Sequence, residues 1–161
     1  MMYNQVKKIL SILTIFVSTS MSCFGQNSDS EINLIQEIFG LEKTEMLSEL
    51  LGDVNDEFWS TYKEYEEKRM ALGKERLALI RSYSEAYDSL TDEKIDQLLK
   101  DIQTQSKNTE NLINQYTKKI KKVSGSKVAA QFYQLETYLL AAVRVKIMEI
   151  TPIIGELDPQ Y

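Results

Sequence analysis

The segment from Glu57 to Leu90 contains no proline and a single glycine, and its apolar and aromatic residues recur at alternating spacings of four and three. This spacing places side chains along one side of an α-helix, as the seam of a heptad repeat. About 35 residues at 1.5 Å each give a rod of roughly 50 Å. A compact globule of this size cannot cover such a helix, so the pattern predicts a long helical partner. The stripe consists of Phe58, Tyr62, Tyr65, Arg69, Leu72, Arg76, Leu79, Ile80, Tyr83, Tyr87 and Leu90.

Two further long helices are predicted downstream. Thr91, followed by two acids, is typical of an N-cap and predicts a helix over 92–123, which the sequence SGS at 124–126 ends. A third helix is predicted over 127–150, where Pro152 stops it. The sequence therefore predicts an all-α fold of coiled-coil character, a long antiparallel helical hairpin plus a third long helix.

The part before the long helices carries a weaker pattern. Apolar residues between Glu31 and Leu51 have helical spacing, with Gly40 interrupting, which predicts one or two short helices that end near Gly52. Asp53 or Asn55 would cap the long helix that follows. The predicted organisation is a signal peptide at 1–25, a leader with short helices at 26–56, a long-helix domain at 57–150 and a C-terminal tail at 151–161.

The N-terminus has the layout of a secretory signal peptide. Two lysines at 7–8 precede an apolar run from Ile9 to Val17, and small and polar residues follow. The run is too short to span a bilayer. Cleavage after Gly25 would leave Gln26 as the first residue of an exported, periplasmic protein. The alternative is an uncleaved amphipathic or membrane-anchoring helix.

Cys23 is the only cysteine of the chain and offers a second interpretation. A lipoprotein would carry its lipid there, and Ser22 before it suits that processing, whereas Ser20 stands where a Leu-like residue is usual. Cleavage after Gly25 instead leaves no thiol. Packing alone would then hold an exported fold without disulfides.

The charge balance and the residue types argue against several functions. The net charge is −5, and removal of residues 1–25 takes away two lysines and no acid, which leaves about −7. An acidic exported chain whose only basic run is KKIKK at 118–122 is not typical of a nucleic-acid binder. No histidine is present, which removes the commonest general base and metal ligand. Carboxylate pairs such as Glu66 with Glu67 lie on predicted solvated faces. We therefore expect no enzyme, no catalytic residue, no metal and no cofactor.

The arginines on the apolar stripe call for partners, because a buried guanidinium without a carboxylate costs several kcal/mol. Antiparallel pairing across a turn at 89–91 places Arg76 opposite Gln105. Our hypothesis is a polar layer that fixes helix register, made of Arg69, Arg76, Glu110 and Glu136. The alternative is a binding surface in which those arginines act with amphipathic aromatic residues. The aromatic candidates are Phe58, Trp59, Tyr62, Tyr65, Tyr83 and Tyr87.

Two stretches carry a family resemblance, FWSTYKEYEEKRMALGKERLALIRSYSEAYDSLTDEK and KVAAQFYQLETYLLAAVRVKI, the latter closing on TPIIGELD. Over about residues 57–155 the chain resembles small exported bacterial helical proteins, mostly uncharacterised. These in turn resemble the Spy/CpxP group of envelope-stress proteins, whose mark is a twice-occurring L-T-x-x-Q. Only LTDEK at 90–94 approaches that motif, with Lys94 in the place of Gln.

The resemblance implies a helical hairpin, in a dimeric cradle, that binds unfolded clients or an envelope-stress sensor without ATP. We therefore expect an exported, non-enzymatic protein-binding protein, a chaperone or a stress-sensor accessory, with protein partners that include a second copy of itself. The alternative is a structural or assembly protein of the cell envelope, self-associating and lipid-anchored at Cys23. The membrane would be reached only through the signal peptide or that lipid.

Overall fold

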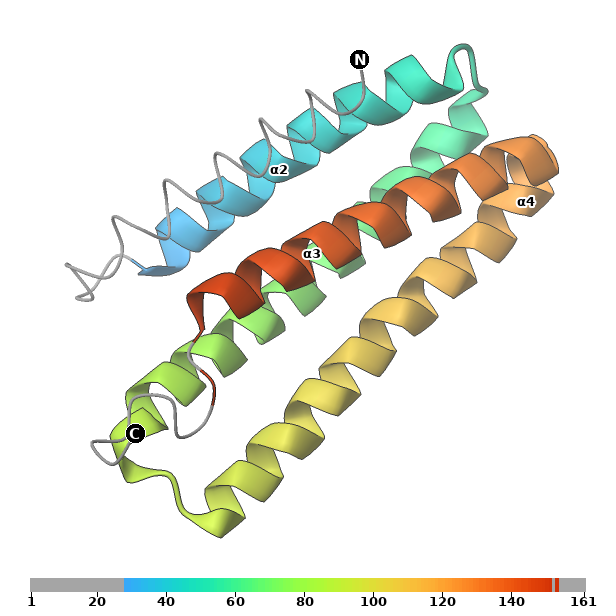
Figure 1. Cartoon of the computed structure of the whole chain (residues 1–161). Coiled ribbons are helices and arrows are strands. Elements are labelled where there is room, and N and C mark those ends of the chain that lie inside the picture. Colours follow the sequence, from blue (N-terminus) through green and yellow to red (C-terminus); the bar gives the residue numbers. More distant parts are fainter. Residues whose placement is uncertain (1–27, 152, 154–161) are drawn as a thin grey trace.

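The computed structural model describes residues 28–151 and 153, which form α-helices joined by short turns (Figure 1). The helices are α2 (Ser28–Leu51), α3 (Asp56–Ala86) and α4 (Asp92–Ile150), and a short 3₁₀ helix, η1 (Tyr87–Ser89), joins α3 to α4. No strand occurs within this described part. The prediction of an all-α fold is confirmed.

Helix α4 is bent back on itself at Gly125. This glycine has φ 85° and ψ 173°, a backbone conformation that side-chain-bearing residues rarely adopt. We call residues 92–124 the first arm of α4 and residues 126–150 its second arm. The predicted end of the second long helix at SGS is therefore correct, since the chain reverses there.

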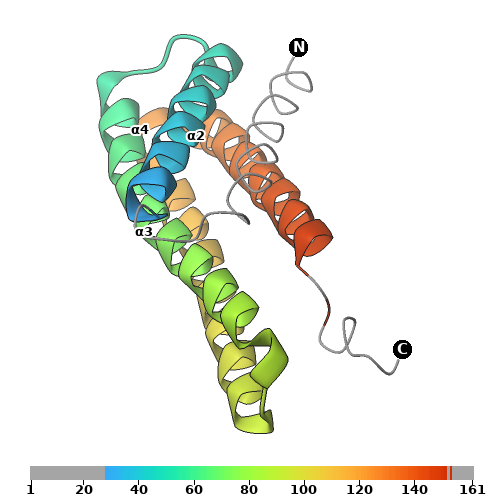
Figure 2. The same cartoon turned by 90° about the vertical axis from the view of Figure 1, so that its left-hand side faces the viewer.

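The four rods run alternately up and down, so each is antiparallel to the one before it (Figures 1 and 2). Figure 2 shows that α3 and the first arm of α4 reach further than α2 and the second arm, so the turn around η1 forms a protruding tip. The predicted reversal near Leu90 is found there. Helix α3 stops at Ala86, slightly short of the turn expected at 89–91, because its last turn tightens into η1.

The caps that end and begin the helices explain these boundaries. Asn55 accepts a hydrogen bond from the backbone N–H of Phe58 at 2.9 Å, and Thr91 accepts one from Lys94 at 3.4 Å. Helix α2 ends before Gly52, whose φ is 67°. The sequence alone located Thr91 and Gly52, and of the two caps it offered for α3, Asp53 or Asn55, the structure has Asn55.

Helix α2 corrects the expectation that Gly40 interrupts the leader. It is one helix of 24 residues that runs through Gly40 without a break. A glycine inside a helix costs only about 1 kcal/mol relative to alanine, which neighbouring contacts can offset. A Cβ at Gly40 would lie 3.5 Å from Glu66 Oε2, so the glycine lies close against α3.

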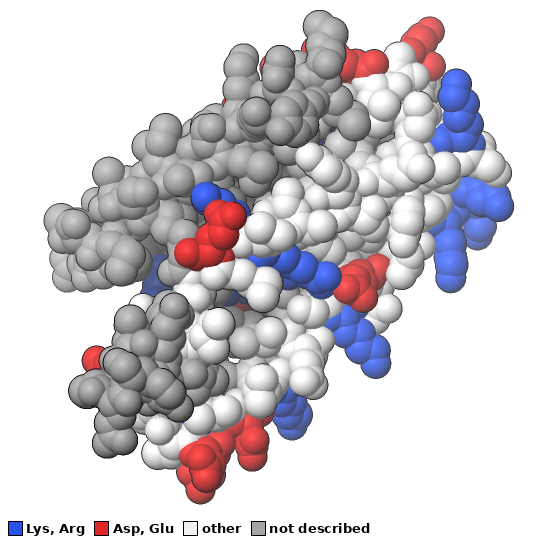
Figure 3. Space-filling view, viewed as in Figure 1, with Lys and Arg blue, Asp and Glu red and all other residues white. Residues whose placement is uncertain are grey.

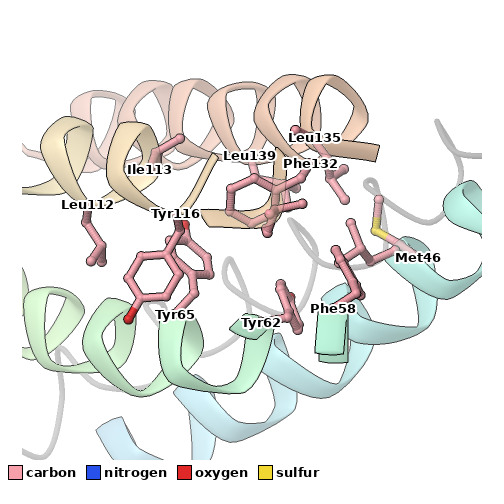
Figure 4. Packing of buried hydrophobic residues seen from close by; sticks show 13 residues of the cluster. Met46, Phe58, Tyr62, Tyr65, Leu112, Ile113, Tyr116, Phe132, Leu135 and Leu139 are labelled. Atoms are coloured by element: carbon pink, nitrogen blue, oxygen red, sulfur yellow. The ribbon is translucent and has the colours of Figure 1, made fainter. Parts of the chain in front are cut away.

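The hydrophobic core lies toward the Gly125 end, between α3 and the two arms of α4, with the last turns of α2 added (Figure 4). Beyond Tyr65, none of the predicted stripe on α3 is fully buried, so the protruding tip is a two-helix ribbon with half-buried contacts. The buried apolar residues are Met46, Leu47, Phe58, Tyr62, Tyr65, Leu112, Ile113, Tyr116, Ile120, Ala129, Phe132, Leu135 and Leu139.

Several predictions fall outside the described residues. They are the signal peptide at 1–25, the lipidation of Cys23, the start at Gln26 and most of the tail at 151–161.

Candidate functional site

A charged network lies inside the core, where α2, α3 and the second arm of α4 meet. Lys43 of α2 is completely buried, and its ammonium group contacts the carboxylates of Glu66 and Glu136, the latter at 2.9 Å. Glu66 also accepts a hydrogen bond from Arg69 Nε at 3.0 Å. The network therefore contains two positive and two negative side chains, and their formal charges cancel.

Aromatic rings enclose this network. The hydroxyl of Tyr65 donates to Glu136 Oε2 at 2.6 Å, a short bond of the kind made to an ionised acceptor. The ammonium of Lys43 lies 5.1 Å from the ring centre of Tyr65 and 5.6 Å from that of Tyr62. These are cation–π distances. Lys43 is thus held by two carboxylates and two ring faces, which together replace the water it loses.

Burial and nearby charges act in opposite directions on the pKa values of Glu66 and Arg69 and in the same direction on that of Tyr65. Burial by itself would raise the pKa of Glu66, but the charges of Lys43 and Arg69 and their hydrogen bonds lower it below its usual value. Burial would lower the pKa of Arg69, and Glu66 with Glu136 raise it instead. The pKa of Tyr65 is raised by burial and by the charge of Glu136. The structure therefore favours the ionised carboxylate and guanidinium and the neutral phenol.

The network differs in part from the polar layer expected from the sequence. Arg69 lies in it, but its hydrogen-bonded carboxylate is Glu66, one helical turn away on α3. Glu136 lies in it too, paired with Lys43. For Glu110 the expectation is wrong, because this residue lies at the surface and pairs with Arg144 at 3.0 Å, its side chain 57% exposed. The side chain of Glu110 points from the first arm toward the second arm, where Arg144 lies, and not toward α3.

Arg76 lies outside the charged network and contacts the side-chain amide of Gln105. This corrects the expectation that Arg76 shares a polar layer with Glu110 and Glu136. Its Nε and Nη2 both donate to Gln105 Oε1 at 3.2 Å. Gln105 is buried, and its Nε2 donates to the Leu72 carbonyl at 3.0 Å and to Thr109 Oγ1 at 3.1 Å. Burial and the nearby charge of Arg144 lower the pKa of Arg76. The expected facing of Arg76 and Gln105 is found.

Most of the aromatic candidates belong to the core. Phe58, Tyr62 and Tyr65 are at most 3% exposed, so they do not offer a binding surface. Figure 4 shows Tyr65 beside Tyr116, and the ring centres lie 5.4 Å apart. Trp59 is half-buried against the core.

Tyr83 and Tyr87 lie near the protruding tip. Their rings meet edge to face with centres 5.7 Å apart, and the Tyr87 hydroxyl donates to the carbonyl of Ile153 at 2.9 Å. This hydrogen bond ties Ile153, three residues beyond the end of α4, to the start of η1. The six aromatic candidates therefore split between the core and a contact with the chain that follows α4.

A groove of about 210 Å³ separates the two arms of α4 and opens to the surface. The ion pair of Glu110 with Arg144 lies along it, and apolar and small polar side chains form its walls. We call this the inter-arm groove. Its lining residues are Glu110, Ile113, Asn114, Tyr133, Thr137, Leu140, Ala141 and Arg144.

Exposed apolar residues continue from the inter-arm groove toward the tip. Leu99 and Ile102 precede Glu110 on the first arm and are 48% and 46% exposed. Val145 and Met148 follow Arg144 on the second arm and are 56% and 77% exposed. Because Glu110 and Arg144 pair across the arms, two of these residues lie on the tip side of that pair on each arm. We call them the apolar strip.

Sequence reasoning missed Lys43 and misplaced Glu66. Lys43 lies four residues before Leu47, so it occupies the apolar stripe of α2 just as the arginines occupy that of α3. The four-residue spacing from Lys43 to Leu47 is the sequence pattern that would have predicted a buried lysine there. Glu66 was assigned to a solvated face, but it adjoins the seam residue Tyr65, and its side chain is only 14% exposed.

Among the residues that the structure describes, no group of three or more His, Cys, Asp or Glu side chains is placed to hold a metal ion. No helix in that part of the chain is both long and apolar enough to cross a bilayer. Comparisons found no match for the chain among protein-family models, curated proteins or solved structures.

Proposed function

We propose that this is an exported, non-enzymatic protein-binding protein, acting as an ATP-independent chaperone of the Spy/CpxP type or as an accessory of an envelope-stress sensor. The observation that carries the proposal is the apolar strip beside the inter-arm groove. Four large apolar side chains, each about half exposed or more and two on each arm, lie on the tip side of a groove with an arginine, a glutamate and a tyrosine. Large exposed apolar side chains that border a groove are typical of interaction sites.

The chemistry of the strip suits a partner whose apolar side chains differ in size and shape along its sequence. Met148 is flexible and polarizable, so it adapts to differently shaped apolar groups. The Arg144–Glu110 pair at the groove offers both a donor and an acceptor to a polar backbone or side chain. Such a surface would hold an exposed segment of an unfolded chain through many weak contacts.

The rigidity of the rest of the molecule also supports this role. The inter-arm groove is lined by Ile113 of the core and by Leu140, which packs against the core, so an occupant of the groove would meet a preformed surface. A preformed surface loses less entropy on binding than one that must first become ordered.

The test is suppression of aggregation of a denatured client by a stoichiometric amount of the full chain. Replacement of Ile102 and Met148 together by serine should weaken client binding about 10-fold, because two apolar side chains no longer become buried. The matched control is Leu41→Ser on α2, which removes an apolar side chain that is 68% exposed but lies away from the strip. It should leave suppression unchanged.

Two results would contradict the proposal. One is absence of both suppression and binding to any envelope partner in a crosslinking pull-down. The other is an equal loss of suppression in the strip variant and in Leu41→Ser. Sedimentation of the unliganded chain tests the alternative function, since an assembly protein that self-associates through the strip would form oligomers that the same double replacement dissociates.

A further inference from the structure

Arg76 of α3 is a half-buried arginine that is not neutralised by a carboxylate. Its Nε and Nη2 both donate to Gln105 Oε1 at 3.2 Å, and that oxygen carries no formal charge. Arg76 makes no ion pair with any described residue. Partial removal of a guanidinium from water without a counter-charge is unfavourable, so a positive charge is held here against its own solvation.

Gln105 holds this guanidinium in a fixed place. The side chain of Gln105 is buried, and its Nε2 donates to the Leu72 carbonyl at 3.0 Å and to Thr109 Oγ1 at 3.1 Å. A backbone carbonyl can only accept, so the amide nitrogen must face Leu72 and the amide oxygen must face Arg76. An amide oxygen accepts from a guanidinium without cancelling its charge. Arg76 is therefore positioned and remains charged.

A second arginine lies close by on the second arm of α4. Burial and the charge of Arg144 together lower the pKa of Arg76. Arg144 Nη2 donates to Glu110 Oε1 at 3.0 Å. Gln105 and Glu110 are separated by about 7.5 Å along the first arm, so the two guanidinium groups that they hold lie within about one and a half helical turns of each other. Two positive side chains share one acid, which leaves an excess of one positive charge.

The other charged side chains at this level do not remove the excess. Residues 72–80, 101–110 and 140–149 flank the two arginines on the three rods, and they contain five basic and four acidic residues. Figure 3 shows a mainly uncharged surface between the two arms, on which positive and negative side chains lie side by side. The basic residues are Lys74, Arg76, Lys107, Arg144 and Lys146, and the acids are Glu75, Asp101, Glu110 and Glu149.

The two arginines border the apolar strip. Ile102 lies about one turn before Gln105 on the first arm, and Met148 lies about one turn after Arg144 on the second arm. Both apolar side chains are about half exposed or more. A bound segment that contacts them therefore passes beside the two guanidinium groups.

We infer that Arg76 and Arg144 bind a carboxylate of the partner, the side chain of an aspartate or glutamate that is flanked by apolar residues. This inference rests on the proposed function, since it names the chemistry of the segment that the apolar strip holds. A carboxylate accepts hydrogen bonds at both oxygens, and the guanidinium N–H groups that Gln105 and Glu110 do not use can donate to them. One bound carboxylate balances the one excess positive charge. Partial burial strengthens the contact, because less water competes for the donors.

The test compares two synthetic peptides that differ at one position. Both are short, labelled with a fluorophore and built of alternating leucine and serine, with a central aspartate in one and a central asparagine in the other. Fluorescence anisotropy with the full chain gives the Kd of each peptide. The aspartate peptide should bind about 10-fold more tightly, as expected for charge-assisted hydrogen bonds at a half-buried site.

Three variants locate the source of this preference. Arg76→Gln should bind both peptides equally, with an unchanged Kd for the asparagine peptide. Gln105→Glu gives Arg76 a carboxylate of its own and should also abolish the preference, which provides a second route if Arg76→Gln fails to fold. The matched control is Lys74→Gln, an exposed lysine of α3 whose replacement changes the net charge by the same amount. It should keep the full 10-fold preference within about twofold.

The outcomes separate this inference from the proposed function. Equal binding of the two peptides by the unsubstituted chain would overturn the inference and leave the proposed function standing. Failure of both peptides to bind would contradict both. A preference that survives in Arg76→Gln and in Gln105→Glu would overturn the inference, since other groups would then bind the carboxylate. An equal loss in Lys74→Gln would overturn it too, because net charge would then be the cause.

Discussion

Lys43 of α2 and Glu136 of α4 form an ion pair with 2.9 Å between Nζ and Oε1, at a point where the lysine side chain is 0% and the glutamate side chain 4% exposed. The two residues are far apart in the sequence and belong to the first and last helices described. Their pairing fixes α2 against the second arm of α4, because sliding either helix would leave both charges buried and unpaired.

Replacement of Lys43 by methionine should destabilise the fold by about 3–5 kcal/mol, since two buried carboxylates would lose their shared cation. The free energy of unfolding in urea measures this. Lys74→Met, on the exposed side of α3, is the control and should change it by less than about 0.5 kcal/mol. If the double variant with Glu136→Gln loses as much as the two single variants together, Lys43 and Glu136 do not interact energetically.

Replacement of Tyr65 by phenylalanine removes only the hydroxyl that donates to Glu136 at 2.6 Å. Hydrogen bonds to charged groups contribute about 1.5–3 kcal/mol, and the variant should lose that much stability by chemical denaturation. Tyr133→Phe alters an exposed tyrosine and should have little effect. Equal unfolding midpoints for the two variants would contradict a role for the Tyr65 hydroxyl.

The lowered pKa of Glu66 predicts a loss of stability in acid. A carboxyl whose pKa is lower in the folded state than in the unfolded chain stabilises the fold above its usual value of 4.5. That contribution disappears as the pH falls through the folded-state pKa. Unfolding free energies measured from pH 7 down to about pH 2 should therefore drop below pH 4.5, and less steeply in Glu66→Gln. An unchanged slope in that variant would assign the acid sensitivity to other carboxylates.

Replacement of Gly125 by alanine should cost about 1–3 kcal/mol, because its φ of 85° is strained for any residue with a Cβ. The added methyl group itself meets no atom within 4 Å, so the cost comes from the backbone alone. Gly40→Ala is the opposite case. Its backbone is helical and the methyl group makes an ordinary contact, so stability should hold or rise by up to about 1 kcal/mol. Thermal melts of both variants distinguish the two glycines.

Local chemistry explains why so much of the fold could be predicted. Asn55 and Thr91 cap helices, and Gly52 and Gly125 end helical segments, through interactions within a few residues of each other. The alternation of four and three along α3 likewise depends only on helix geometry. These features need no knowledge of which helix lies where. The continuity of α2 through Gly40 is not visible in this local chemistry, since the packing of that turn against Glu66 of α3 involves residues far along the chain.

The candidate site was only partly predictable for the same reason. The position of Arg69 and Arg76 on the apolar stripe indicated that both needed polar partners. Antiparallel pairing of the two helices across the turn at 89–91 placed Gln105 opposite Arg76, where the structure has it. Lys43 could not be joined to this layer, because no turn of known length fixes α2 against the second arm of α4.

By itself, then, the sequence determined three long amphipathic rods, their caps and their reversals, since each depends on neighbours within about one helical turn. Tertiary structure alone decided which charges neutralise one another. It placed Glu136 beside Lys43 and left Glu110 at the surface with Arg144. The physical reason is that the interaction between two buried charges depends steeply on their separation and their exposure to water, and both are set by how distant helices pack.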